Sequence, residues 1–215
     1  GPDNVPLTTF VGLILIIVGL LFKVAAAPFQ AWAPDVYQGS PTGYVGYMAT
    51  VAKVSSFIVL ARLVAVSLTF IIDQFDLFFG AVVILSVLAG ALFAANQSDL
   101  KRLIAYSGVI QSGFILSGIS SGVYGISAST FYLITYIIQL IGIFTVFSII
   151  SGQLSSDFQI SNISGLFKEN KFITITFSIF MLGLAGLPLT SGFVSKFILI
   201  TNLWSDERYI LVTVL

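Results

Sequence analysis

A lysine in the middle of a long apolar run, followed closely by a proline, constrains this chain more than any other feature. Lys23 lies inside the run from about residue 7 to residue 33, and Pro28 interrupts that run five residues later. An ammonium group at the centre of a bilayer costs about 3 kcal/mol even on mild insertion scales. Proline removes a backbone donor and clashes with the carbonyl four residues before it. Both features are tolerated at membrane depth only where the segment faces protein or water, so together they indicate an ion path.

The composition predicts an integral membrane protein. Hydrophobic residues make up 57% of the chain and charged residues 8%, whereas soluble domains carry roughly a quarter charged residues. The net charge is zero, so no nucleic-acid partner is expected. Cysteine and histidine are both missing, which excludes disulfides, iron–sulfur ligation, histidine-ligated haem and the usual transition-metal sites. We therefore expect no metal and no redox cofactor in this chain.

Apolar segments predict an all-α, polytopic transmembrane helix bundle embedded in a lipid bilayer. The expected spans are about 7–33, 43–66, 77–95, 101–119, 124–150 and 171–203, with a loop at 34–42 and a turn at 73–76. The connections after the first, third and fifth spans hold four lysine and arginine residues against two on the other side, which predicts that these connections are cytoplasmic. The last segment, from Tyr209, is too short to span, so we expect a fragment of a longer protein.

The first and sixth spans share three properties. Both are overlong, both are broken by proline, and both carry a lysine near mid-depth. The breaks of the sixth span are Gly186, Pro188 and Gly192, and Lys196 follows them. The sixth span follows the first by five steps along the chain, so the two run in opposite directions, as the halves of an inverted-repeat transporter do. We expect residues 1–66 to end a first repeat and residues 67–215 to form a second repeat that is truncated in its last helix.

Three lysines, Lys23, Lys53 and Lys196, are central in apolar runs, whereas all nine acidic residues lie in connections or at span ends. A buried amine must be paired, hydrated or neutralised, and desolvation brings its proton exchange toward neutral pH. Two ammonium groups about 10 Å apart repel by roughly 1.7 kcal/mol at an effective dielectric of about 20. Loading one amine would displace the proton from the next, so the three lysines are candidate proton carriers. A single intramembrane lysine could instead snorkel or make a structural pair.

A row of polar residues follows one stretch of the fifth span. Its members are Tyr132, Thr135, Tyr136 and Gln139, which recur at helical spacing. The row fits the lining of a hydrated path and fits interhelical hydrogen bonding equally well.

Three blocks of residues resemble the antiporter-like membrane subunits of respiratory complex I. The first comprises Phe22-Lys23, Pro28-Phe29-Gln30, Trp32 and Pro34-Asp-Val-Tyr37-x-Gly39-Ser-Pro-Thr42, with Lys53 eleven residues further on; the others are Ser98 to Ser107 and Leu184 to Lys196. The Pro-Asp-Val-Tyr form is typical of subunit N, so the chain is identified as similar to that branch of the family.

The resemblance implies a proton-pumping subunit of NADH:quinone oxidoreductase in a bacterial inner membrane, with an antiporter-like inverted-repeat fold. Its partners would be the other complex I membrane subunits, and NADH, FMN, iron–sulfur clusters and quinone would be bound by partner subunits. Lys23, Lys53 and Lys196 would correspond to the proton-translocating lysines. Lys23 would be a gate paired with an upstream glutamate, Lys53 a central carrier, and Lys196 the carrier toward the outlet.

Two residues depart from the family pattern. Gln30 and Gln111 stand where most relatives carry histidine, and glutamine forms hydrogen bonds but does not titrate. We expect structural roles for both. Two other functions stay open: a subunit of an Mrp-type monovalent cation/proton antiporter, which needs no redox partner, and a non-conducting membrane scaffold.

Overall fold

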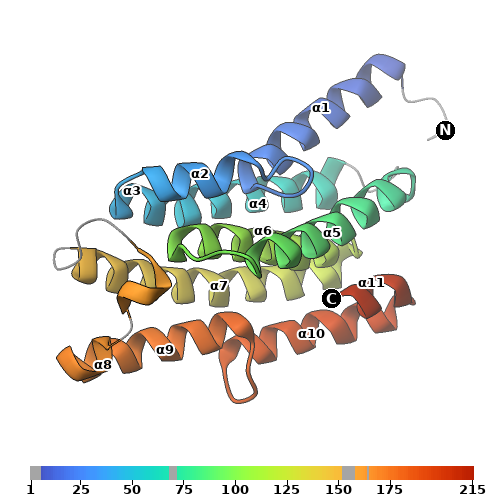
Figure 1. The fold of residues 1–215 in the computed structure, drawn as a ribbon. Coiled ribbons are helices and arrows are strands. Elements are labelled where there is room, and N and C mark those ends of the chain that lie inside the picture. Colours follow the sequence, from blue (N-terminus) through green and yellow to red (C-terminus); the bar gives the residue numbers. More distant parts are fainter. Residues whose placement is uncertain (1–5, 68–71, 152–157, 164) are drawn as a thin grey trace.

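The computed structural model describes residues 6–67, 72–151, 158–163 and 165–215, and within these ranges the regular secondary structure is helical (Figure 1). The α-helices are α1 (Leu7–Val24), α2 (Trp32–Gly39), α3 (Thr42–Tyr47), α4 (Lys53–Arg62), α5 (Ile72–Ala94), α6 (Leu100–Ile119), α7 (Gly122–Ser151), α8 (Leu166–Glu169), α9 (Lys171–Ala185), α10 (Ser191–Ser205) and α11 (Tyr209–Val214). Two π-helical segments, η1 (Met48–Ala52) and η2 (Leu63–Ser67), and a 3-10 turn, η3 (Ile160–Ile163), complete the set.

Several of these helices have the length and apolarity of membrane spans. Three continuous helical stretches qualify by both criteria, Thr42–Val66, Gln74–Ala94 and Gly122–Ser151, and two shorter apolar helices are Thr8–Val24 and Lys171–Ala185. The two shorter helices are the broken ones. The prediction of an all-helical membrane bundle with two interrupted helices is confirmed.

The first break ends α1 earlier than expected. Ala25 adopts the left-handed conformation (φ 57°), and the N–H groups of Ala25 and Ala26 both reach back to carbonyls of the last turn of α1. This is a helix C-cap, so the helix has already stopped when Pro28 is reached. The expected loop at 34–42 is wrong over most of its length, because α2 occupies residues 32–39; Pro34 is tolerated there since the first turn of a helix needs no N–H donor.

The second break repeats the capping of the first. Gly186 is left-handed (φ 82°), and Gly186 and Leu187 donate to the carbonyl of Leu182 at 3.0 and 3.2 Å. Gly192, expected as part of the break, lies instead in the first turn of α10. A Cβ at Gly192 would lie 1.8 Å from the carbonyl oxygen of Gly183, so glycine lets the start of α10 pack against the end of α9.

The expected second span is one helical stretch with two irregular turns. The π-helical segment η1 ends at Ala52, immediately before Lys53, and η2 follows α4. An added residue in a turn rotates all later side chains about the helix axis, and such turns are frequent at functional sites. The expected turn at 73–76 is also wrong, because α5 already begins at Ile72.

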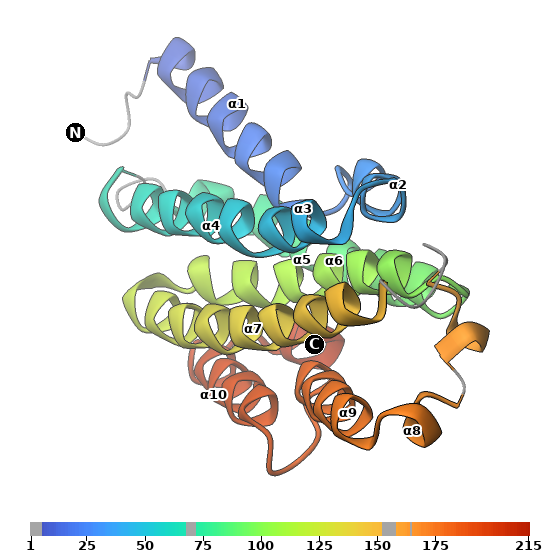
Figure 2. The same ribbon diagram turned by 90° about the vertical axis from the view of Figure 1, so that its left-hand side faces the viewer.

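Helix α6 lies at the centre of the bundle. It packs between α5 and α7 and also contacts α2, α4 and α10, and most of its residues from Gly108 onward are buried. The α9–α10 pair covers α7 on the side away from α4, and α1 projects away from the other helices (Figure 2). Exposed apolar side chains such as Leu77 (86% exposed) and Phe172 (80%) lie on the outside, as expected of a surface that meets lipid.

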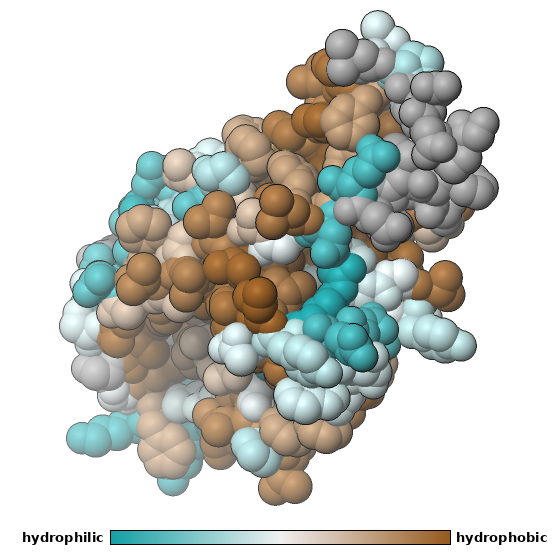
Figure 3. Space-filling view, turned by 90° about the vertical axis from the view of Figure 1, so that its right-hand side faces the viewer, coloured by the Kyte–Doolittle hydropathy of each residue, from teal (hydrophilic) through white to brown (hydrophobic). Residues whose placement is uncertain are grey.

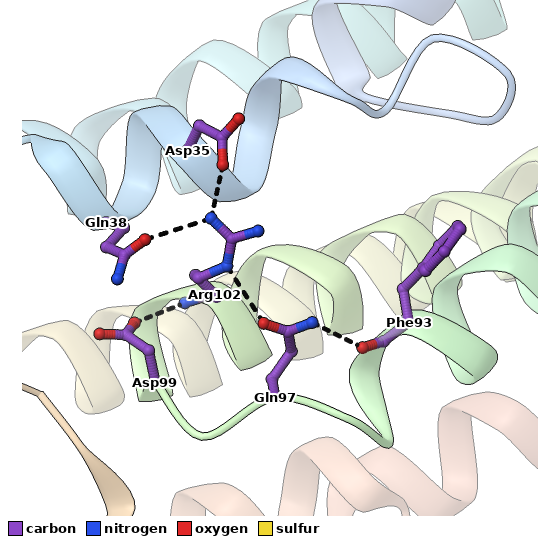
Figure 4. Close-up of polar contacts among 6 residues, drawn as sticks. All are labelled: Asp35, Gln38, Phe93, Gln97, Asp99 and Arg102. Atoms are coloured by element: carbon purple, nitrogen blue, oxygen red, sulfur yellow. Dashed lines mark hydrogen bonds and ion pairs between the residues drawn. The ribbon is translucent and has the colours of Figure 1, made fainter.

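At one end of the bundle, Arg102 fastens α2 to the start of α6 (Figure 4). Its guanidinium donates to Asp35 at 2.5 Å, to Gln38 at 3.1 Å and to Gln97 at 3.1 Å, while its backbone N–H is capped by Asp99. A partly exposed ion pair contributes little by itself, but these bonds fix the connection between α1 and α3 in position.

The neighbouring lysine secures the same end. The Nζ atom of Lys101 donates to the carbonyl of Ser40 at 2.9 Å and lies 4.8 Å from the ring centroid of Phe158. Residues from the connections after α1, α5 and α7 therefore meet here, which agrees with their expected placement on one side of the membrane.

The opposite end has its own ionic contact. Arg208 pairs with Asp76 at 2.6 Å and donates to the backbone carbonyl of Ser120 at 3.1 Å, joining the starts of α5 and α11 to the end of α6. Figure 3 shows this end of the molecule, where hydrophilic side chains form a band beside broad hydrophobic surface.

Candidate functional site: buried amines on either side of helices α6 and α7

Lys53 is the most deeply buried of the three central lysines. Its side chain is 2% exposed, and its Nζ atom donates to the backbone carbonyl of Gly108 on α6 at 3.0 Å. Gly108 makes room for this contact, because a Cβ there would lie 2.8 Å from the Lys53 Nζ atom and 3.1 Å from the hydroxyl of Tyr136. The amine and the phenol therefore meet at one point on α6.

The polar row of α7 divides into two faces. Tyr132 and Tyr136 face α6, where the Tyr132 hydroxyl donates to the side-chain carbonyl of Gln111. Thr135 and Gln139 face the α9–α10 pair. All four side chains are buried, with exposed fractions of 3–7%.

The second face of α7 meets the start of α10. The Thr135 hydroxyl lies 3.2 Å from the Ser195 hydroxyl, which in turn donates to the carbonyl of Gly192 at 3.0 Å. The Gln139 amide nitrogen points at Gly183 and Gly192 and has no hydrogen-bond partner within the described ranges. Interhelical hydrogen bonding thus accounts for Tyr132 and Thr135, whereas Tyr136 lies beside an amine.

Lys196 folds back from α10 over the second break. It is partly buried, its Nζ atom donates to the carbonyl of Ala185 at 3.0 Å, and it lies 5.0 Å from the ring centroid of Phe114. The negative end of the α9 dipole favours a cation at this position. Phe114 stacks on Tyr132 with centroids 5.7 Å apart, so the residues around Lys196 contact those around Tyr132.

Lys23 differs from the other two lysines. It lies in the last turn of α1, its side chain is exposed, and no described residue pairs with it. The nearby break is anchored from α5, where the hydroxyl of Ser86 accepts a hydrogen bond from the N–H of Ala27 at 2.9 Å. Pro28 lies in this break, five residues after Lys23. It takes no part in the contacts described for Lys53 and Lys196.

No group of histidine, cysteine, aspartate or glutamate suited to a metal ion occurs in the part of the chain that the structure describes. The contacts available to the amines are backbone carbonyls, hydroxyls, amides and aromatic rings. These groups can orient and stabilise an ammonium or a neutral amine.

The sequence matches a described family over nearly its whole length. Residues 4–215 match the transmembrane part of the NADH:quinone oxidoreductase/Mrp antiporter family. The chain belongs to this family. The resemblance found in the sequence motifs is thereby confirmed.

Individual members of the family agree with this assignment. The chain is 44% identical over 191 residues to NADH-quinone oxidoreductase subunit N of Mycobacterium tuberculosis, covering 86% of this chain and 36% of the relative. A chain of respiratory complex I from Thermus thermophilus with bound aureothin superposes with a TM-score of 0.80 at 34% identity, covering 94% of this chain and 44% of that chain. A chain of the Mrp complex from Dietzia superposes with a TM-score of 0.87 at 24% identity, covering 95% and 38%, and shows the shared fold. This member of the family thus spans well under half the length of those relatives.

Sequence reasoning missed part of the site. Gly108, Ser112 and Ser195 make the contacts that join the helices, but a small residue in an apolar span is ordinary. The one available signal was the density of glycine and serine in α6, which is typical of closely packed membrane helices.

Replacing Gly108 with alanine tests the geometry around Lys53. The new methyl group would lie 2.8 Å from the Lys53 Nζ atom, too close for the present position of the amine, and the flexible end of the lysine can move away, so we expect the protein to assemble. Misplacement of a reacting group by about 1 Å costs up to about a hundredfold in rate, so we expect proton transport by the assembled protein to fall by about tenfold or more. Gly80→Ala on α5, where a Cβ meets nothing within 4 Å, is the matched control. Equal transport by the two variants would show that the position of the Lys53 amine is unimportant.

Proposed function

We propose that this chain forms part of a proton-translocating, subunit-N-like membrane subunit of an NADH:quinone oxidoreductase in a bacterial inner membrane. The observation that carries the proposal is the buried Lys53 amine beside Tyr136, with Lys196 partly buried on the far side of α7. A buried amine without a carboxylate is costly for a structural role, and the similarity to subunit N supports the proposal that redox chemistry in partner subunits drives the protons.

The proposed order of events follows the contacts. Lys53 is the central carrier, which releases its proton toward the polar residues of α6 and α7. Lys196 is the carrier toward the outlet, where its amine can accept that proton beside the carbonyl of Ala185. When Lys53 binds the next proton, charge repulsion between the two ammonium groups drives the proton on Lys196 toward the outlet.

Lys23 takes the role of gate in this scheme. Because its side chain is exposed and unpaired among the described residues, we propose that a carboxylate outside this chain pairs with it. Such a pair would hold the Lys23 ammonium until redox events elsewhere in the complex disrupt it.

The electron-transfer chemistry is proposed to occur in partner subunits. NADH, FMN, the iron–sulfur clusters and quinone would be bound there, and the chain's immediate partners would be other membrane subunits of the same complex. Its own residues move protons only. The two inverted repeats, 1–66 and 67–215, are part of this proposal. They are supported by the two helix breaks, which are capped by the same pattern of backbone hydrogen bonds.

The test uses the purified complex in closed vesicles. NADH oxidation should acidify one side of the membrane, and this acidification should be the same in sodium-free and sodium-containing buffer. If a sodium gradient without NADH drives proton movement instead, the chain belongs to a cation/proton antiporter. If NADH-driven proton movement is unchanged in Lys23→Met and Lys196→Met, the scaffold function is correct.

A further inference from the structure

The two helix breaks leave backbone carbonyl groups that the helices themselves cannot satisfy. The residue four positions after Val24 is Pro28, and the residue four positions after Leu184 is Pro188. Proline has no N–H, so in both cases the usual i to i+4 hydrogen bond is impossible. An unpaired carbonyl at membrane depth is costly and requires a donor from elsewhere.

Two consecutive residues of α6 supply both donors. The hydroxyl of Ser112 donates to the carbonyl of Val24 at 3.0 Å, and the amide of Gln111 donates to the carbonyl of Leu184 at 3.2 Å. Ser112 is 1% exposed and Gln111 4% exposed. Helix α6 therefore connects the break beside Lys23 with the break beside Lys196.

Each donor also contacts the proposed proton path. The Ser112 hydroxyl lies 2.8 Å from the carbonyl of Gly108, which is the acceptor for the Lys53 amine. A hydroxyl has one proton to donate, so Ser112 serves either Val24 or Gly108. The Gly108 carbonyl has two acceptor positions, and the α-helical N–H of Ser112 takes one of them. When the Lys53 amine takes the other, the Ser112 proton is left for Val24.

Gln111 has the equivalent arrangement on the other side. Its amide nitrogen holds the Leu184 carbonyl while its amide oxygen accepts the hydrogen bond of Tyr132. Gln111, which was expected to have a structural role, therefore links Tyr132 of α7 to the second break.

We propose that Gln111 and Ser112 form a positioning pair that couples the two broken helices through α6. Through Ser112, the position of the break after α1 depends on whether the Lys53 amine is bound to the Gly108 carbonyl. Gln111 links the position of α6 to the second break, which lies beside Lys196. Neither residue carries the proton. This inference rests on the proposed proton translocation and adds the element that makes the lysine sites interdependent.

The experiment compares single and double substitutions in the complete complex. The variants are Ser112→Ala, Gln111→Met, the double variant, and Gln111→His, whose ring can donate and accept in place of the amide. Ser117→Ala is the control, because Ser117 is buried in the same helix but donates only within it, to Phe114. Protons moved per NADH oxidised, and the pH profile of that ratio, are measured per assembled complex, since a purely structural role would change only the amount assembled.

We expect Ser112→Ala and Gln111→Met each to lower the ratio about threefold to tenfold, as mutations in a coupling element do, and to displace its pH profile. The double variant should lose less than the product of the single effects, since both act through one helix. Gln111→His should retain most of the ratio. If both single variants match Ser117→Ala, or change only the amount of complex, the positioning pair is refuted. If Ser112→Ala does not assemble, Gln111→Met against Gln111→His decides the question alone.

Lys53→Met separates this result from the proposed function. If Lys53→Met leaves the ratio unchanged, the proton path itself is wrong, and the positioning pair is wrong with it. If Lys53→Met lowers the ratio while the Gln111 and Ser112 variants behave like the control, only the positioning pair is wrong.

Discussion

Replacing Lys53 with methionine is expected to reduce NADH-driven proton transport about a hundredfold, the typical contribution of a positioned proton-transfer group. The amine is 2% exposed and is held by the Gly108 carbonyl beside Tyr136, so no other described group can take its place at that point. Methionine is unbranched and of similar volume, and it removes a costly buried amine, so the subunit should still fold. NADH oxidation should slow less than proton transport does, so that fewer protons are moved per NADH oxidised.

The control for this variant is Lys168→Met. Lys168 lies on the short helix α8 and is exposed, so its loss removes one positive charge without touching the path. We expect it to behave as the unmodified protein does. Transport by Lys53→Met at the level of Lys168→Met would show that the buried amine is structural. The rates of NADH oxidation and of vesicle acidification, measured on equal amounts of complex, give the comparison.

Replacing Gly192 with alanine is expected to have the largest effect on stability. The added Cβ would lie 1.8 Å from the carbonyl oxygen of Gly183 and 2.9 Å from its carbonyl carbon. Both are backbone atoms of α9, so relief requires the two half-helices to separate. Overpacking in a well-packed core costs about 1–3 kcal/mol and occasionally more, and with rigid backbone on both sides we expect about 3 kcal/mol or more.

Heat-induced loss of the assembled complex on native gels measures this effect. Gly43→Ala on α3, where the added Cβ meets nothing within 4 Å, is the control and should match the unmodified protein. A normal melting temperature for Gly192→Ala would mean that α9 and α10 are not in close contact at the break.

The helical bundle and its two breaks were predictable because hydrophobicity and proline act locally. An ammonium in an apolar run has few tolerable environments, so the burial of Lys53 followed from its own sequence neighbourhood. The same reasoning was wrong for Lys23 within this chain, because its side chain is exposed. The avoidance of the membrane interior by charged residues also predicted that Lys101 and Arg102 lie at one end of the bundle.

Other features depended on contacts between distant residues. The helix α2 and the π-helical turn before Lys53 were not predicted, because proline-containing and continuous apolar stretches give no local sign of them. Ser112 was missed for a different reason: its role depends on the carbonyl of Val24, which is 88 residues away. For Gln111 the sequence indicated only that the residue does not titrate, and the structure adds the two groups that it joins.

The number of protons moved per NADH oxidised tests the central claim most directly. It should be measured in closed vesicles that contain the complete complex, for the unmodified subunit and for Lys53→Met and Lys196→Met. Passage of protons through the buried amines predicts that both substitutions lower this ratio while the complex remains assembled. An unchanged ratio in both variants would contradict the account.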